Sequence, residues 1–254
     1  MSSALTESID VAQVVLYVFW AFFFALIFWL RREDRREGYP LESDKTRRLT
    51  AVTPAFIPPP KTFLLPHGGS VQAPRFDRDT RPLLAQPTSE ASGVLLQPAG
   101  EPLLSGVGPA AFAPRADIPE TTREGHDLIV PMRVASGFAV NAGPDPRGWK
   151  VVAADGKEAG VIKDLWVDRA DVMVRYLEVE LTAGAGTRLL PITMLRLLRE
   201  PRKVEVYAVR AEHFASVPTL KEADRITVLE EERICAFYAG GRLYAEPKRL
   251  GPVL

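Results

Sequence analysis

The sequence has little cysteine and histidine and no excess charge of either sign, and each shortage excludes a class of protein. The single cysteine, Cys235, excludes an intramolecular disulfide framework and leaves too few thiolates for a zinc finger or a cysteine-ligated iron–sulfur cluster. The three histidines, His67, His126 and His213, are widely spaced, and no HExxH motif is present. Lys+Arg and Asp+Glu both total 32, so the chain lacks the net positive charge typical of nucleic-acid binding.

Motifs of nucleotide binding and acyl transfer are also missing. The chain has no P-loop GxxxxGK[ST], no nucleophile elbow GxSxG and no GxGxxG after a strand. A membrane-anchored hydrolase would need a convergent nucleophile–base motif, and none is present. We therefore expect that this polypeptide alone is not an enzyme.

One long apolar run dominates the N-terminal part of the chain. Residues 11–30 carry no charge, and at 1.5 Å per helical residue they span about 30 Å, the thickness of the hydrocarbon core of a bilayer. A cleaved signal peptide fits poorly, because the run is too long, no basic region precedes it and no small-residue cleavage site follows it. The sequence predicts a single transmembrane helix after a short tail, residues 1–10.

Charge predicts the orientation of this helix. Acidic residues precede the run, and four arginines follow it: Arg31, Arg32, Arg35 and Arg36. The positive-inside rule places the N-terminus outside and the rest of the chain in the cytoplasm. Trp29 and the four arginines are expected at the membrane interface, in contact with lipids.

Eight of the twenty residues in the run are aromatic: Tyr17, Phe19, Trp20, Phe22, Phe23, Phe24, Phe28 and Trp29. A simple tether needs only leucine and valine, whereas large flat side chains suit packing against other helices or flat pigments. Ala21 and Ala25 have the spacing that allows close approach of helices. A lipid-facing anchor is the alternative interpretation.

The segment after the helix is rich in proline and lacks periodicity. Residues 40–146 hold seventeen of the 22 prolines, yet they also carry apolar pairs such as Leu83-Leu84 and Leu95-Leu96. An apolar stretch without periodicity predicts an extended arm laid along the surface of a partner. A partly disordered linker with apolar patches is the alternative.

A globular region follows Pro146. The sequence predicts strands at 149–153, 160–168, 173–181, 188–191 and 203–209, with a hairpin turn at Asp155-Gly156. In the third strand, Leu177, Val179 and Leu181 share one face, and the glutamates 178 and 180 share the other. Thr227 and Glu230 fit a capping box that begins a helix over about 228–238, which we expect to end at the glycine pair 240–241. The fold class is therefore a membrane-anchored α+β protein with a small, mainly antiparallel barrel or sandwich.

Two groups of titratable residues do not fit this pattern. If the third strand extends far enough back, Asp171 and Arg175 share the face of Leu177 and Val179, so Arg175 needs a carboxylate such as Asp168 or Asp171. A structural ion pair is one interpretation, and a carboxylate with a shifted pKa in a proton path is the other. The second group, residues 124–127 (Glu-Gly-His-Asp), is either a loop surface or a place where protons bind.

The order of several short strings along the chain resembles the H subunit of the purple bacterial photosynthetic reaction centre. The strings are REGYPLE (36–42), PKTF (60–63), LPHG (65–68), GVGPA (106–110), VPM (130–132), WVD (166–168), LEVEL (177–181), LLP (189–191), LEE (229–231) and YAGG (238–241). Each string alone is weak, but their order from about Val11 to Arg249 is specific.

This resemblance implies an architecture. It implies a tail (1–10), a transmembrane helix (11–30), a juxtamembrane segment with an extended arm (31–105) and a cytoplasmic globular domain (106–254) with a PRC-barrel-like core at about 146–225. It also implies a single-pass protein of the bacterial inner, intracytoplasmic photosynthetic membrane.

The resemblance implies partners and cofactors as well. The chain would cap the L and M subunits, beside light-harvesting antenna polypeptides and in some complexes a cytochrome subunit. Bacteriochlorophyll, bacteriopheophytin, quinones, non-haem iron and carotenoid would be bound by the partner subunits and not principally by this chain. The alternative function is a membrane-tethered PRC-barrel binding module without a photosynthetic role.

The resemblance also assigns five residues to a proton route toward the secondary quinone. Asp168 and Arg175 match the family aspartate and arginine, and Asp171 stands where we expect a glutamate. His126 matches the second histidine of a surface pair, whereas Glu124 replaces the first. The pair Glu124 and His126 is therefore expected to collect protons and is only a weak candidate for a transition-metal site.

Overall fold

The chain was analysed as a computed structural model that describes residues 10–39, 41, 43, 56–66, 68–75, 82–91, 93–141, 143–182, 184 and 186–249. The predicted tail, apart from Asp10, and His67 lie outside these residues. The chain divides into two compact units, one comprising Met1–Arg81 with Ala91–Gly93, and the other Pro82–Glu90 with Val94–Leu254. Each unit is described below by itself.

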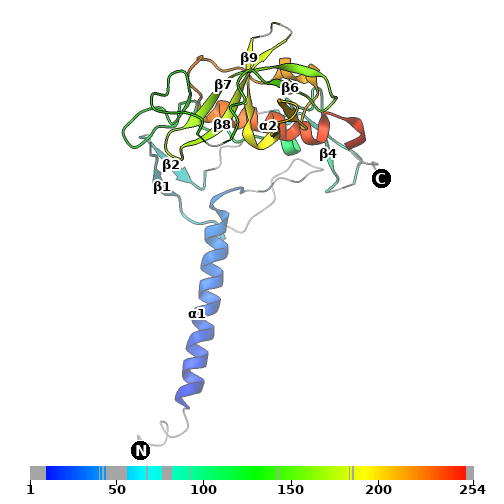
Figure 1. The fold of residues 1–254 in the computed structure, drawn as a ribbon. Coiled ribbons are helices and arrows are strands. Elements are labelled where there is room, and N and C mark those ends of the chain that lie inside the picture. The colour runs from blue at the N-terminus through cyan, green and yellow to red at the C-terminus, as the bar shows by residue number, and fades with distance from the viewer. Residues whose placement is uncertain are drawn as a thin grey trace, which may run out of the picture. The chain divides into compact units, whose positions relative to one another are not determined.

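The first unit contains the predicted membrane helix. Helix α1 (Val11–Glu33) begins at Asp10, whose carboxylate accepts a hydrogen bond of 2.9 Å from the amide of Ala12, and a 3₁₀ turn, η1 (Asp34–Arg36), follows it. Figure 1 shows α1 as one continuous helix. None of its residues is buried, and by length and composition it could cross a membrane. Four rings form a ladder along it through stacked and edge-to-face contacts, those of Phe19, Trp20, Phe23 and Phe24.

The proline-rich region contains short hairpins that the sequence did not predict. In the first unit, β1 (Lys61–Leu64) pairs with β2 (Ser70–Ala73), and in the second unit β3 (Ala85–Pro87) pairs with β4 (Leu96–Pro98). Such short strands give too few alternations for their period to be recognised among prolines. The described part of the arm is therefore extended chain folded back on itself in hairpins.

The second unit is built on a seven-stranded sheet with the order β10-β11-β6-β7-β8-β9, and β5 also pairs with β7. The strands are β5 (Ile129–Pro131), β6 (Lys150–Val152), β7 (Glu158–Asp168), β8 (Met173–Leu181), β9 (Thr187–Pro191), β10 (Leu195–Leu198) and β11 (Lys203–Val206). All pairs are antiparallel except β11 with β6, which confirms the mainly antiparallel prediction.

The long hairpin of β7 and β8 is the centre of this sheet. The bounds of β8 are those predicted from its alternating pattern, and Leu177 and Val179 are fully buried. Glu180 is exposed as expected, but Glu178 on the same face is buried. The alternation predicts that the face of β8 with Glu178 and Glu180 is exposed, but other segments of the chain cover this face at Glu178.

Helix α2 (Val228–Tyr244) packs against β9 and the 3₁₀ turn η3 (Gly108–Ala110). Its capping box is confirmed, because Thr227 Oγ1 accepts from the amide of Glu230 and Glu230 accepts from the amide of Thr227. The predicted end near Tyr238 is wrong, because the helix continues through Gly240 and Gly241. These glycines allow close packing and do not end the helix: a Cβ on Gly240 would lie 2.7 Å from the Cβ of Ala110.

Candidate functional site

The first candidate site lies where β7 ends and β8 begins. The carboxylate of Asp168, at the last position of β7, is almost fully buried, with its side chain 3% exposed. Its Oδ1 accepts hydrogen bonds from the amides of Ala170 and Asp171 at 2.9 and 3.0 Å. Its Oδ2 accepts from Nη2 and Nε of Arg175 at 2.9 and 3.1 Å. The predicted need of Arg175 for a carboxylate is therefore confirmed.

Arg175 joins the buried carboxylate to an exposed one. Its Nη2 lies 2.6 Å from Oδ2 of Asp171, whose side chain is 59% exposed, whereas the side chain of Arg175 is 39% exposed. The three side chains thus form a continuous charged chain from the surface to the end of β7. Net charge is −1, because one guanidinium faces two carboxylates.

The geometry that brings these residues together differs from the one that pleat parity suggested. Strand β8 begins at Met173, so Asp171 lies in the preceding turn, where Val172 has a φ of 52°. Trp166 pairs with Tyr176 and Val167 pairs with Val174, so Arg175 is the extra residue of a β-bulge. A bulge redirects a side chain out of the alternating pattern, and here it directs Arg175 toward the two aspartates.

Opposing effects set the pKa of Asp168. Burial alone would raise it, but the amide of Asp171, the guanidinium of Arg175 and the amide of Ala170 together lower the pKa below its ordinary value. Asp168 is therefore held as an anion. A group with this bias stabilises charge around it and has little tendency to hold a proton at neutral pH.

A second titratable group next to this cluster was missed by sequence reasoning. Glu231 in the first turn of α2 accepts a hydrogen bond of 2.8 Å from the hydroxyl of Tyr176, which also lies 3.7 Å from Sγ of Cys235. Burial raises the pKa of Glu231, and the negative charges of Glu120 and Asp168 raise it further, whereas the hydrogen bond from Tyr176 and the charge of Arg175 oppose the shift. Burial also raises the pKa of Tyr176 and of Cys235.

Glu231 is therefore the group in this region that holds a proton more readily than an ordinary carboxyl. The sequence gave no sign of this, because an acidic residue in the first turn of a helix is commonly explained by the helix dipole. Only the tertiary contact between α2 and the start of β8 shows that the side chain is half-buried.

The predicted surface pair lies in a tight turn before β5. Thr122 and His126 are joined by a backbone hydrogen bond of 2.7 Å, and the amide of His126 also donates to Oγ1 of Thr122. Glu124 and His126 are both exposed, but no hydrogen bond or ion pair joins their side chains within the described chain. Nor do the described residues contain a group of three His, Cys, Asp or Glu side chains suited to a metal ion.

The predicted interface arginines differ in their surroundings. Arg35 lies over the rings of Tyr39 and Phe56, with its Cζ 5.5 and 5.0 Å from their centroids. Arg36 is almost buried and donates to Glu33 and to two backbone carbonyls. Arg31 and Trp29 are exposed, and Arg32 is half-buried. Arg36 thus stabilises the fold at the end of α1, whereas Arg31 stays accessible.

A further buried charge cluster lies at Asp164 of β7 and Glu178 of β8, which face each other in the register of the sheet. Arg133 donates to Glu178 at 2.5 Å, to Asp164 at 3.2 Å and to Asp224, and the indole of Trp166 donates to Glu178 at 3.1 Å. This network explains why Glu178 is buried on a face expected to be polar. The two acceptor side chains Asp164 and Glu178 are 8% and 6% exposed.

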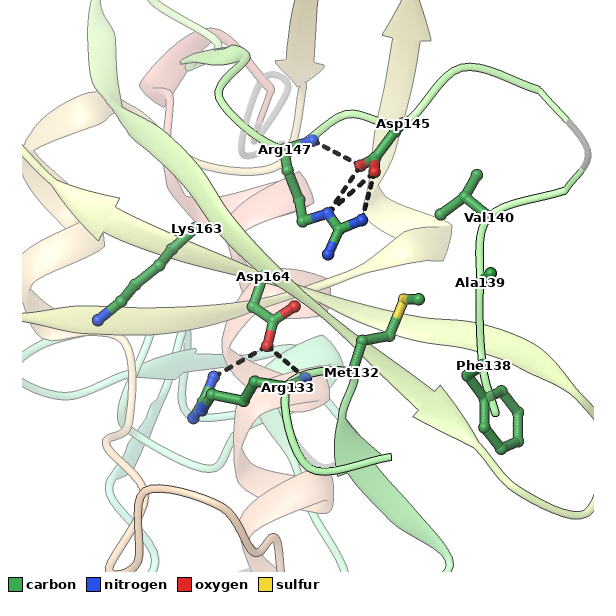
Figure 2. Close-up of a pocket in the computed structure, with 9 residues that line it drawn as sticks. All are labelled: Met132, Arg133, Phe138, Ala139, Val140, Asp145, Arg147, Lys163 and Asp164. Carbon is green, nitrogen blue, oxygen red and sulfur yellow. Dashed lines mark hydrogen bonds and ion pairs between the residues drawn. The ribbon is translucent and has the colours of Figure 1, made fainter. Parts of the chain in front are cut away.

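Beside this cluster is a hollow of about 550 Å³. Figure 2 shows Arg133 with Asp164 on one wall and Arg147 with Asp145 on another, and the carboxylate of Asp145 is 2.5 Å from Nη2 of Arg147. Both arginines on these walls are paired with aspartates, whereas Lys163 on the same lining is exposed and forms no ion pair within the described residues. We therefore regard the Arg133 cluster as structural.

Comparison with protein families decides between a general tether and a specific subunit. The family described as "Photosynthetic reaction centre, H-chain N-terminal region" matches residues 3–134. The chain belongs to the photosynthetic reaction centre H-chain family. The PRC-barrel domain family matches residues 139–212, which contain β6 to β11.

Membership in the H-chain family makes the protein a subunit of a photosynthetic reaction centre that associates with other subunits of the complex. The apolar helix α1 is consistent with a membrane-anchored subunit. A subunit role agrees with the expectation that the chain alone is not an enzyme.

Proposed function

We propose that this subunit caps the cytoplasmic face of the L and M subunits, supports their assembly and conducts protons toward the secondary quinone. The quinone receives electrons one at a time, and its full reduction to quinol takes up two protons from the cytoplasm. A proton crosses protein along titratable groups and ordered water. The observation that supports this role is the chain of charged side chains from exposed Asp171 through Arg175 to buried Asp168.

The residues of this chain would have different tasks. Glu124 and His126, on the surface, would collect protons, and Asp171 would pass them inward. Arg175 cannot give up its proton at physiological pH, so it would keep Asp168 ionised and would not carry protons. Asp168 would supply a fixed negative charge that favours a nearby proton in transit.

Glu231 would be the group that holds a proton on this route. Its raised pKa brings it closer to the pH of the cytoplasm, where a carrier can both accept and release a proton. Its hydrogen bond from Tyr176 leaves the second carboxylate oxygen for a water molecule. The pigments, quinones and iron would be held by the partner subunits, and antenna polypeptides would surround the complex.

The topology that follows from this role has the N-terminus in the periplasm and the globular unit in the cytoplasm, in the bacterial photosynthetic membrane. Arginines after the span and acidic residues before it support this orientation. Cleavage of right-side-out and inverted membrane vesicles by added protease tests it: the globular unit should be cleaved only in inverted vesicles.

The decisive first measurement is the absorption spectrum of the complex that the full-length chain brings down from mild-detergent membranes. Near-infrared bacteriochlorophyll bands, together with two larger membrane subunits, are expected. A colourless preparation from cells that make pigment would contradict the proposal and favour a tethered binding module.

The proton route is tested by flash kinetics in that complex. Asp171→Asn is expected to slow the proton-coupled second electron transfer by about tenfold, equivalent to about 1.4 kcal/mol of barrier, and to leave the first transfer unchanged. Glu200→Gln, an exposed carboxylate on the β10–β11 hairpin, is the matched control. If the rate of the second electron transfer is the same in Asp171→Asn as in the control, Asp171 is not on the route.

A further inference from the structure

The β1–β2 hairpin is fastened directly to the end of the membrane helix. Nη1 of Arg36 donates to the carbonyls of Pro59, just before β1, and of Ala73, at the end of β2, each at 2.8 Å. Glu33 accepts from Arg36 at 2.8 Å and from Nζ of Lys61 at 2.7 Å. The hairpin is therefore joined by hydrogen bonds to Glu33, the last residue of α1, and to Arg36 in η1, which follows the helix.

This arrangement leaves an open hollow of about 510 Å³ between the hairpin and the end of the helix. Its apolar floor is formed by Phe63 of β1, by Leu65 just after β1, and by Val71 of β2. Phe63 and Leu65 are 48% and 46% exposed. Leu64 does not line the hollow, because successive side chains of a strand point to opposite faces.

The rim of the hollow is acidic. Three carboxylates line it, those of Glu33, Asp34 and Glu37, against one guanidinium, that of Arg36. Glu33 is neutralised by Arg36 and Lys61, but Asp34 and Glu37 are exposed and form no ion pair within the part of the chain that the structure describes. Two carboxylates without an ion-pair partner among the described residues thus lie beside an apolar floor.

We propose that this hollow docks a lysine- or arginine-bearing aliphatic segment from the cytoplasmic end of a membrane-spanning partner subunit. The inference rests on the proposed function, which gives the chain such partners and places this end of α1 in the cytoplasm. Cytoplasmic segments next to transmembrane helices carry an excess of Lys and Arg, so their charge complements Asp34 and Glu37. The aliphatic side chains of the same segment would cover Phe63 and Leu65.

The charge of the rim distinguishes this occupant from an anionic phospholipid. A phosphate group in the hollow would face Asp34 and Glu37 without a free cation on the lining, because Arg36 is already bonded to Glu33 and two carbonyls. An anionic headgroup is therefore repelled, whereas a basic peptide segment is attracted.

The test uses the tagged full-length chain, purified with its partners in mild detergent and washed with increasing salt. The variant Asp34→Lys/Glu37→Lys is expected to retain about tenfold less partner at low salt, because two attractive charges become repulsive. The difference should shrink as salt screens the charges. Leu65→Ser should also reduce retention, whereas Leu64→Ser on the opposite face and the exposed pair Glu101→Lys/Glu200→Lys should retain partner as the wild type does.

The outcomes separate this inference from the function on which it rests. If the wild type retains its pigmented partners and both hollow variants retain them equally well, the docking site is overturned and the function stands. Loss of co-purifying phospholipid without loss of partner would identify a lipid as the occupant and also overturn the proposal. A wild-type chain without pigmented partners would overturn the function itself.

Discussion

At the scale of single residues, two arginines bind buried carboxylates of the β7–β8 hairpin, one near its turn and one further along the strands. Arg175 bonds to Asp168, and Arg133 bonds to Asp164 and Glu178. The sequence predicted the first contact, because Arg175 lies close to Asp168 along the chain. It did not predict the second, because Arg133 precedes Glu178 by 45 residues and nothing local marks the two as partners.

Removing Arg133 should be more destabilising than removing an exposed arginine. Arg133→Met would leave Asp164 and Glu178 buried without their cation, and we expect the free energy of unfolding to fall by about 3 kcal/mol. The value is at the low end for such pairs, because the side chain of Arg133 is itself 36% exposed. Thermal unfolding of the purified chain in detergent measures this, with Arg147→Met as the control, whose expected change is under about 1 kcal/mol.

Asp168 should stabilise the fold more than Asp171, although both bond to the same guanidinium. Asp168→Asn removes charge-assisted bonds at a buried position and should lower the free energy of unfolding by about 2 kcal/mol. Asp171→Asn, at an exposed position, should change it by less than about 0.5 kcal/mol. Equal melting temperatures for the two variants would contradict the view that burial determines the difference.

The raised pKa of Glu231 predicts a specific dependence of stability on pH. A carboxyl whose pKa is higher in the folded state favours folding fully below its ordinary pKa, and this contribution is lost as pH rises through the folded value. Glu231→Gln removes that dependence. The melting temperature of the variant relative to wild type should therefore rise as the pH increases above about 4, and a constant difference would contradict the shift.

At the scale of elements, strands and helices with a clear period were predictable, and close contacts between elements were not. The alternation of Leu177, Val179 and Leu181 gave the bounds of β8, and uninterrupted apolar residues gave α1. The end of α2 was wrong because Gly240 and Gly241 serve as contact surfaces for other segments. A glycine selected for close packing looks, in a sequence, like a glycine that ends a helix.

Adding a methyl group to Gly241 tests this explanation. A Cβ there would lie 2.4 Å from Cγ1 of Val209 and 2.8 Å from the carbonyl oxygen of Ala208. Gly→Ala in a helix normally stabilises by about 1 kcal/mol, but here we expect a net loss of about 2 kcal/mol from overpacking. The control is Ala239→Gly in the same helix, whose free energy of unfolding should fall only by the difference in helix propensity between alanine and glycine. A Gly241→Ala variant more stable than the wild type would show that close packing does not require glycine at this position.

At the scale of the whole molecule, the chain divides into a membrane-associated unit and a unit built on the seven-stranded sheet. The sequence predicted one part of each unit, the apolar helix of the first and the strand-rich region of the second. The sequence did not indicate where one unit ends and the other begins, because the proline-rich region extends through both units and its strands β3 and β4 belong to the second. The site residues of the second unit come from separate elements that only the folded sheet and α2 bring together.

The second unit has its own core and should fold without the membrane helix. A polypeptide of residues 82–254 is expected to show the aromatic bands of a fixed tertiary structure in its near-ultraviolet circular dichroism spectrum. It should also unfold in one cooperative transition. Disordered spectra from this fragment would show that the first unit is required for folding. Val151→Ala, in the fully buried core, should lower its melting temperature by several degrees.

The turn that carries Asp171 also links the stability of the backbone to the position of Asp171, the residue for which we propose a role in proton transfer. Val172 is branched at Cβ, is 72% exposed and adopts a φ of 52°, a conformation that suits glycine or asparagine far better. A designer seeking heat resistance would replace it first. The more flexible backbone of Val172→Gly would, however, hold Asp171 less firmly against Arg175. The substitution that relieves the backbone strain would therefore leave the carboxylate of Asp171 less well positioned.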